Sequence, residues 1–296
     1  MNSHTFTVLL SVFILTTIGC TSNPYTDRSQ FLLVPESAEV QMGEEAYTKV
    51  LKDPKVQISK NPAEVEPVRR VAKRIIEAAK KSKYARRARS FNWEVNVIKD
   101  DRTKNAWALP GGKIAFYTGI FPEAKNENGL AAIMGHEVVH ALARHGAERM
   151  SQSLAANIGV NVGSALLGLP PIGSDLAMQA VGLGILLPFS RSHESEADYI
   201  GLLLAAEAGY DPREAVRLWQ RMAQAAKKAP PEFLSTHPSN KTRISNLQKW
   251  MPEAMTIYER SQKATVSELP TIISPPSEKK TEQKKDSQAC LYFTSL

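Results

Sequence analysis

The chain has 296 residues, 43% of them hydrophobic, which is enough apolar material for one larger domain with tails or for two small domains. Its two cysteines, Cys20 and Cys290, lie near opposite ends, which argues against a disulfide framework and against a cysteine-based zinc site. The formal net charge is +7, but the basic residues are not interleaved with aromatic ones, so we expect no nucleic-acid partner. We interpret the charge as solvated helix faces and a tail, with a basic face near an anionic membrane as the weaker alternative.

The N-terminus has the pattern of an export signal. Residues 8–15 form an apolar run that is too short for a stable transmembrane helix, and small residues follow it. The sequence Thr17-Ile18-Gly19-Cys20 resembles a bacterial lipobox, which implies a signal peptide over residues 1–19 and lipidation of Cys20. Because Thr21 is not aspartate, the resemblance favours the outer membrane, with the protein facing the periplasm. The alternatives are an ordinary cleaved signal, which would leave a soluble periplasmic protein, or a buried N-terminal helix.

Residues 20–62 are expected to link the lipid anchor to the domain and to dock on it. Apolar spacing predicts a helix that begins near Ser37 and an amphipathic helix over residues 64–81. The alternation from Trp93 to Val97 predicts a half-buried strand.

A hairpin is predicted between residues 105 and 119, because two short apolar runs flank a Pro-Gly-Gly turn. Its edge could hold an extended peptide through backbone hydrogen bonds, whatever the side chains of that peptide. The candidate substrate-binding residues are Leu109, Pro110, Gly111 and Gly112. The alternative is that the hairpin is only part of the core.

The motif that organises the chain is His136-Glu137-Val138-Val139-His140, inside an apolar-periodic helix predicted over about residues 128–150. Positions i and i+4 share one helix face, so the two imidazoles can point at one zinc ion. Glu137 is placed to accept a proton from water at that ion. Such a motif also arises by chance, so the rest of the sequence must show whether this one binds a metal ion. His145 comes five residues after His140, which turns it off the metal face, and we expect a structural or surface histidine.

The apolar, glycine-rich segment 154–189 is interrupted by Pro170-Pro171. Each half is too short for a comfortable membrane span. A mobile lid near the active site, a membrane-surface contact and a pair of core helices are all compatible with this pattern. A short last helix is expected around Ile244 to Trp250.

A helix predicted from Ser190 to Gly209 opens with several charged residues. Glu194 and Asp198 share one helix face, so Glu194 could bind zinc while Asp198 accepts the second ring N–H of a ligand histidine. His193 and Glu196 are rival third ligands, and spacing alone leaves this choice open. Taken by itself, the segment could also be an acidic helix start that the helix dipole favours.

The H-E-x-x-H motif followed by Glu-x-x-x-Asp resembles peptidase family M48, the HtpX-like and CAAX-prenyl-protease-like zinc metallopeptidases, and within it the BepA/LoiP-like and Oma-type members. The resemblance covers about residues 23–250 and includes Leu109-Pro110-Gly111-Gly112, Gly209-Tyr210-Asp211-Pro212 and Ser235-Thr236-His237-Pro238. It implies a mainly α-helical fold with a small β-sheet or hairpin, a zincin of the gluzincin type.

The resemblance also implies a role for each site residue. By position, His136, His140 and Glu194 would bind one zinc ion per chain. Glu137 would be the general base and Asp198 the partner of a ligand histidine. His237 would approach the metal, either to stabilise the oxyanion or to gate the site, and Arg243 would orient substrate or a carboxylate.

These patterns predict a zinc endopeptidase of the bacterial cell envelope, with its catalytic domain over residues 63–260 and a disordered basic tail over residues 261–296. Its expected partners are unfolded or misfolded envelope proteins and, through lipidated Cys20, the membrane. The alternative function is a periplasmic chaperone or assembly factor for outer-membrane proteins with latent protease activity. A purely structural zinc site is disfavoured, because three protein ligands leave one position open.

Overall fold

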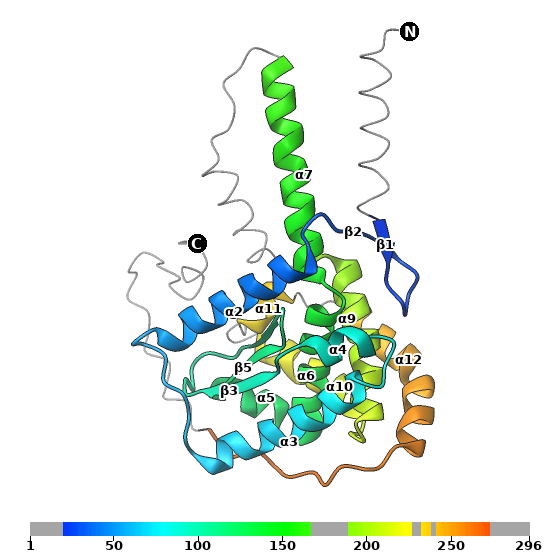
Figure 1. The fold of residues 1–296 in the computed structure, drawn as a ribbon. Coiled ribbons are helices and arrows are strands. Elements are labelled where there is room, and N and C mark those ends of the chain that lie inside the picture. Colours follow the sequence, from blue (N-terminus) through cyan, green and yellow to red (C-terminus); the bar gives the residue numbers. More distant parts are fainter. Residues whose placement is uncertain (1–19, 167–188, 227–231, 238–240, 273–296) are drawn as a thin grey trace.

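The computed structural model describes residues 20–166, 189–226, 232–237 and 241–272. The expected signal peptide, Cys290 and part of the apolar segment 154–189 lie outside these residues. In chain order the elements are β1 (Cys20–Ser22), β2 (Ser29–Phe31), α2 (Glu36–Lys52), α3 (Pro62–Ala79), α4 (Ala85–Ser90), β3 (Glu94–Ile98), β4 (Ala106–Leu109), β5 (Lys113–Tyr117), the 3-10 helix η1 (Thr118–Ile120), α5 (Phe121–Ala124), α6 (Glu127–Leu142), α7 (His145–Leu166), α9 (Arg191–Glu207), α10 (Arg213–Ala226), α11 (Phe233–Thr236) and α12 (Lys241–Arg260) (Figure 1).

The larger sheet has three strands in the order β3-β5-β4. Strands β4 and β5 form the expected antiparallel hairpin, in which Leu109 pairs with Lys113. The turn between them uses Gly111 and Gly112 at φ of 84° and 86°, a conformation that glycine adopts without strain. Strand β3 pairs in parallel with the other side of β5. Strand β4 is therefore an edge of this sheet, and helix α6 packs against it.

Helix α6 carries the H-E-x-x-H motif and contacts α3, α9, α10 and β4. Nearly all of its residues are buried, which explains why its sequence is apolar around the whole circumference. The side chain of Asn126 caps its start by accepting the backbone N–H groups of Asn128 and Gly129. The motif therefore lies on a rigid element inside the core.

Helices α6 and α9 cross at two glycines. A Cβ atom on Gly201 would lie 2.7 Å from the backbone nitrogen of His136, and one on Gly135 would lie 2.7 Å from the carbonyl oxygen of Gly201. No side chain fits at this crossing, so the two backbones touch. This close approach brings the first turns of α9 within side-chain reach of the motif histidines.

The single helix predicted over residues 128–150 is wrong, because α6 ends at Leu142 and α7 begins at His145. Between them Arg144 has a φ of 59°, which a non-glycine residue adopts only when its surroundings hold it there. Its guanidinium donates to the carboxylate of Glu39 and to the carbonyl of Val34, both at 2.6 Å. The break redirects α7, which leaves the body of the domain in Figure 1. His145 is buried, which agrees with a structural histidine, but this break and not the rotation along one helix sets the direction of its side chain.

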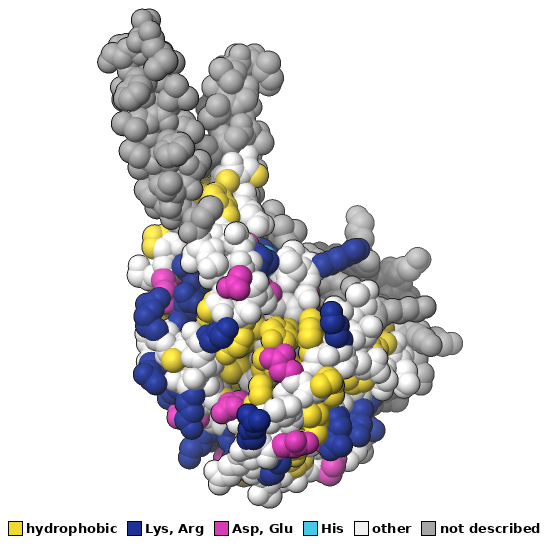
Figure 2. All heavy atoms as spheres, turned by 90° about the vertical axis from the view of Figure 1, so that its right-hand side faces the viewer, with side chains coloured by type: hydrophobic (Ala, Val, Ile, Leu, Met, Phe, Trp, Pro, Cys, Tyr) yellow, Lys and Arg dark blue, Asp and Glu magenta, His cyan; other side chains and the backbone are white. Residues whose placement is uncertain are grey.

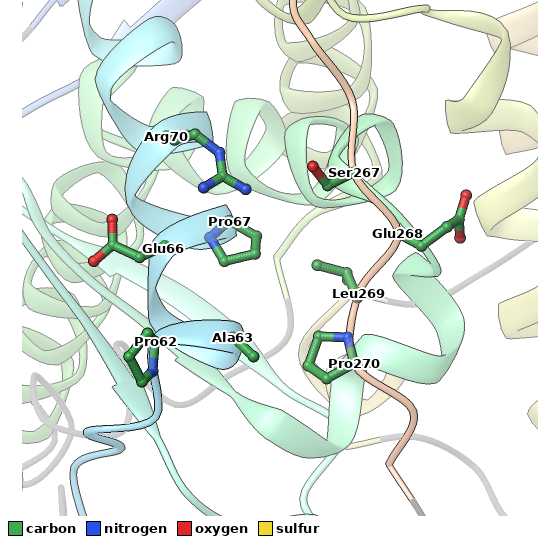
Figure 3. Close-up of a pocket in the computed structure, with 9 residues that line it drawn as sticks. All are labelled: Pro62, Ala63, Glu66, Pro67, Arg70, Ser267, Glu268, Leu269 and Pro270. Atoms are coloured by element: carbon green, nitrogen blue, oxygen red, sulfur yellow. The ribbon is translucent and has the colours of Figure 1, made fainter.

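The C-terminal part also differs from expectation. Helix α12 has 20 residues instead of being short. Residues 261–272, expected to begin a disordered tail, run across the domain as an extended strap: Ala264 donates to the Gly209 carbonyl at 2.9 Å and Leu269 to the Lys125 carbonyl at 2.8 Å. Between this strap and α3 lies a cleft of about 330 Å³, shown in Figure 3.

Within the described residues, no helix combines the length and the apolar character that crossing a bilayer requires. On the face shown in Figure 2, lysine and arginine side chains alternate with acidic ones around a strip of apolar side chains. This mixed distribution supports the interpretation of the positive charge as solvated helix faces.

Candidate metal centre

The two histidines of the motif converge. His136 and His140 lie one turn apart on α6, and their Nε2 atoms are 3.1 Å from each other. Both side chains are buried, and burial holds the pKa of both imidazoles well below its ordinary value. They are therefore neutral, the form in which histidine binds a metal ion.

Glu194 comes from the first turn of α9, where Ser190 caps the helix by accepting the backbone N–H of His193. Its carboxylate oxygens lie 3.3 Å from His140 Nε2 and 3.6 Å from His136 Nε2. Burial by itself would raise the pKa of Glu194, but the surrounding histidines outweigh it and hold this pKa well below the ordinary range. The cluster thus contains one ionised carboxylate.

The two rival ligands point elsewhere. His193 Nε2 lies 3.0 Å from a carboxylate oxygen of Glu148, and Glu196 pairs with Arg28 at 2.8 Å. Of the three candidates on α9, only Glu194 reaches the motif histidines. The structure therefore decides a choice that spacing left open.

His237 follows α11 and completes the cluster. Its Nδ1 lies 2.9 Å from Glu194 Oε1 and 3.2 Å from His136 Nε2. The candidate ligand atoms of His136, His140, Glu194 and His237 all lie within 4.8 Å of one another. Three imidazoles and one carboxylate suit zinc, whereas calcium and magnesium prefer sets of oxygen ligands. The ring of His237 stacks on Phe233, with centroids 4.5 Å apart.

Glu137 points into the same region from α6. One of its carboxylate oxygens is 3.4 Å from His237 Nε2, and the backbone amide of Ala108 on β4 donates to the carboxylate. Burial raises the pKa of Glu137 to about 7. A carboxyl group with this pKa can both accept and return a proton near neutral pH.

Arg243 and Asp198 contact the candidate ligands and hold them in place. Asp198 Oδ1 lies 3.0 Å from His136 Nδ1, so it can accept the second ring N–H of that histidine. Arg243 holds Asp198 at 2.6 Å and Glu194 at 2.8 Å, and its guanidinium lies 3.4 Å over the ring of Trp219. Burial raises the pKa of Asp198 to about 6, against the opposing effect of Arg243. Of the two roles expected for Arg243, the structure shows the contact with carboxylates.

Phe189, which precedes α9, covers the cluster. Its ring centroid lies 3.8 Å from that of His140, and its ring stacks on His237 at 5.4 Å. The guanidinium of Arg149 lies 3.6 Å from the same ring. Sequence reasoning missed Phe189 because it ends an apolar segment without carrying any motif.

The hairpin turn lies apart from this chemistry. The nearest neighbours of a Cβ atom on Gly111 would be Val40 and Glu44 of α2, and on Gly112 they would be the ring of Trp93 and the Cβ atom of Phe91. These glycines pack the turn against the domain. It is Ala108, one residue before the four predicted positions, that contacts Glu137.

A buried helix supplies two histidines and a glutamate, a neighbouring helix supplies a second glutamate, and a sheet edge lies beside them. These features define a zincin-like metallopeptidase. Comparison with known proteins agrees. The model of "Peptidase family M48" matches residues 62–251, and the chain belongs to this family.

Several curated relatives are metalloendopeptidases. The mitochondrial metalloendopeptidase OMA1 of Schizosaccharomyces pombe is 39% identical over 242 residues, which cover 80% of this chain and 68% of that protein. The same enzyme of Saccharomyces cerevisiae is 34% identical over 250 residues, covering 80% and 71%. The beta-barrel assembly-enhancing protease of Yersinia pestis is 33% identical over 154 residues, covering 48% and 31%. The chain is accordingly a metalloendopeptidase.

The expected location is wrong. The lipobox-like sequence predicts an outer-membrane lipoprotein facing the periplasm or a soluble periplasmic protein, whereas two relatives that each match 80% of the chain are mitochondrial proteins. A short apolar run with small residues after it is a compositional signal that different targeting sequences share. Lipidation of Cys20 stays a prediction.

Proposed function

We propose that this metallopeptidase holds one zinc ion per chain with His136, His140 and Glu194 and hydrolyses internal peptide bonds of misfolded or membrane-associated proteins. The observation that carries the proposal is the convergence of these three buried side chains next to Glu137. When bound there, zinc would polarise the scissile carbonyl and acidify a water molecule.

Glu137 supplies the proton transfers. Its carboxylate can accept a proton from water as the peptide carbonyl is attacked and return it to the leaving amine. The N–H of Ala108 holds this carboxylate in place. Asp198 and Arg243 contribute indirectly, since they orient His136 and Glu194.

The substrate lies along β4. This strand is a sheet edge, and its amide at Ala108 already points outward to Glu137, so a peptide added beside β4 passes the general base. Of the four residues predicted to bind substrate, Leu109 belongs to β4 and Pro110 follows it directly. Gly111 and Gly112 shape the turn.

His237 gates the site. A catalytic zinc ion keeps one position open, and a fourth protein ligand would close it. The Nδ1 atom of His237 lies among the ligand atoms, so we infer that cleavage requires this side chain to move aside. Once displaced, an imidazole near the cluster can stabilise the oxyanion.

The test is the Glu137→Gln variant, assayed on a denatured protein and on a peptide derived from it. We expect unchanged zinc content and at least a hundredfold loss of cleavage, because amide cannot act as a base. Glu127→Gln is the matched control, since Glu127 is also buried on α6 but pairs with Arg70 outside the cluster. Cleavage by the Glu137→Gln protein at the unsubstituted rate would refute the mechanism.

A second candidate function is a chaperone or assembly factor with latent protease activity. Phe189 and His237 together cover the cluster, which suits an enzyme that is silent at rest. The name of the Yersinia pestis relative, which joins a protease to an assembly role, also supports it. Full complementation of a deletion strain by the Glu137→Gln form would favour this candidate, and no complementation would favour the protease.

A further inference from the structure

The second ring nitrogen of each motif histidine has its own partner. His136 Nδ1 faces the carboxylate of Asp198. His140 Nδ1 instead faces another imidazole: it lies 3.0 Å from Nδ1 of His145, whose Nε2 lies 3.1 Å from Glu196 Oε2. His145 is fully buried and Glu196 nearly so. The break between α6 and α7 makes this contact possible, because it returns His145 to His140.

Only one pattern of protons satisfies this chain of contacts when His140 binds a metal through Nε2. His140 must then carry its proton on Nδ1 and donate it to His145 Nδ1. His145 must accept there, so its own proton is on Nε2, from which it donates to Glu196. Each ring nitrogen of His140 and His145 then has one partner. Both imidazoles are neutral, as complete burial favours.

We propose that His145 and Glu196 are positioning residues that fix the ring orientation and the tautomer of His140 for metal binding. This inference rests on the proposed function, in which His140 is a zinc ligand. Partners of this kind commonly change metal affinity about 10–100-fold. The two ligand histidines thus have unlike supports, a carboxylate for His136 and an imidazole–carboxylate relay for His140.

The antiparallel pair of strands β1 and β2 near the N-terminus holds the Glu196 end of this relay. Arg28, between β1 and β2, donates to Glu196 Oε2 at 2.8 Å, and the hydroxyl of Thr26 donates to the other oxygen of the same carboxylate. Arg28 also holds Glu148 through two hydrogen bonds of 2.8 Å. A segment more than 100 residues before the motif therefore restrains one metal ligand through three consecutive contacts.

The test compares two neighbouring buried histidines in the full-length chain. His193 stacks on His145 with ring centroids 4.5 Å apart and pairs with Glu148, but it has no hydrogen bond to a ligand of the cluster. His145→Phe and His145→Asn are matched by His193→Phe and His193→Asn. Zinc dissociation constants are measured by competition with a chromophoric chelator, and unfolding temperatures of the metal-free proteins are measured in parallel.

We expect His145→Phe to bind zinc at least tenfold more weakly. His145→Asn should recover part of this loss, because its side-chain oxygen can accept the N–H of His140. Both His193 variants should stay within about threefold of the unsubstituted chain, even though they lose thermal stability. The visible spectrum of the cobalt-substituted protein should change in His145→Phe and not in His193→Phe.

Zinc affinity of His145→Phe within threefold of the unsubstituted chain would overturn the positioning role. Equal losses in the His145 and His193 variants would overturn it too, because general destabilisation would then explain both. Failure of the unsubstituted chain to bind zinc would instead refute the proposed function itself.

Discussion

Replacement of Gly201 by alanine tests whether the contact between α6 and α9 sets the metal geometry. The new Cβ atom would lie 2.7 Å from the nitrogen of His136 and 2.8 Å from the carbonyl carbon of Gly135, which are both backbone atoms. An ordinary contact begins at 3.4 Å, so the helices must separate by about 0.7 Å. Metal–ligand distances tolerate only about 0.2 Å. Glu194 should therefore lose its place beside the motif histidines.

We expect Gly201→Ala to destabilise the metal-free protein by about 2 kcal/mol, since overpacking of a core costs about 1–3 kcal/mol. For a domain of this size that corresponds to an unfolding temperature about 4–8 °C lower. Zinc binding, measured by chelator competition, should weaken at least tenfold.

Gly146→Ala is the matched control, because a Cβ atom on this helical glycine meets nothing within 4 Å. It should be neutral or stabilising by up to about 1 kcal/mol, as expected for alanine in a helix. Equal stability and equal zinc affinity of the two variants would refute the reasoning about the helix crossing.

Three further predictions concern charge and metal. Arg243→Met should destabilise the metal-free protein by about 3 kcal/mol, because it leaves Glu194 and Asp198 buried without their cation, and urea unfolding measures this. Burial raises the pKa of Glu137 from 4.5 to about 7, so the folded state keeps a proton that the unfolded state has released. The stability of the metal-free protein should therefore fall by at most about 3 kcal/mol as the pH rises from 4.5 to 7, and Glu137→Gln should flatten this fall. Treatment with a chelator should abolish cleavage, and zinc but not magnesium should restore it.

The sequence predicts the part of the site that local periodicity controls. Helical spacing places His136 and His140 on one face, and Ser190 marks the start of α9. The hairpin turn follows from the backbone freedom of Gly111 and Gly112. For these features the residues that interact are close in the chain, so one-dimensional patterns carry the information.

Other parts depend on contacts between distant segments. The break at Arg144 requires Glu39 and Val34, more than 100 residues earlier, and without it His145 would point away from His140. In the sequence, Gly135 and Gly201 look like ordinary helix residues. Only the three-dimensional structure shows that the backbones of α6 and α9 are in contact at these glycines. Which acid on α9 reaches the cluster depends on this crossing, which is why spacing could not choose between Glu194 and Glu196.

Zinc content measured together with cleavage tests the central claim most directly. The purified full-length chain should contain about one zinc ion and cleave a denatured protein, and Glu137→Gln should keep the zinc without cleaving. Glu194→Ala should lose both zinc and cleavage. Stoichiometric zinc in the Glu194→Ala protein, or cleavage by the metal-free chain, would contradict the account.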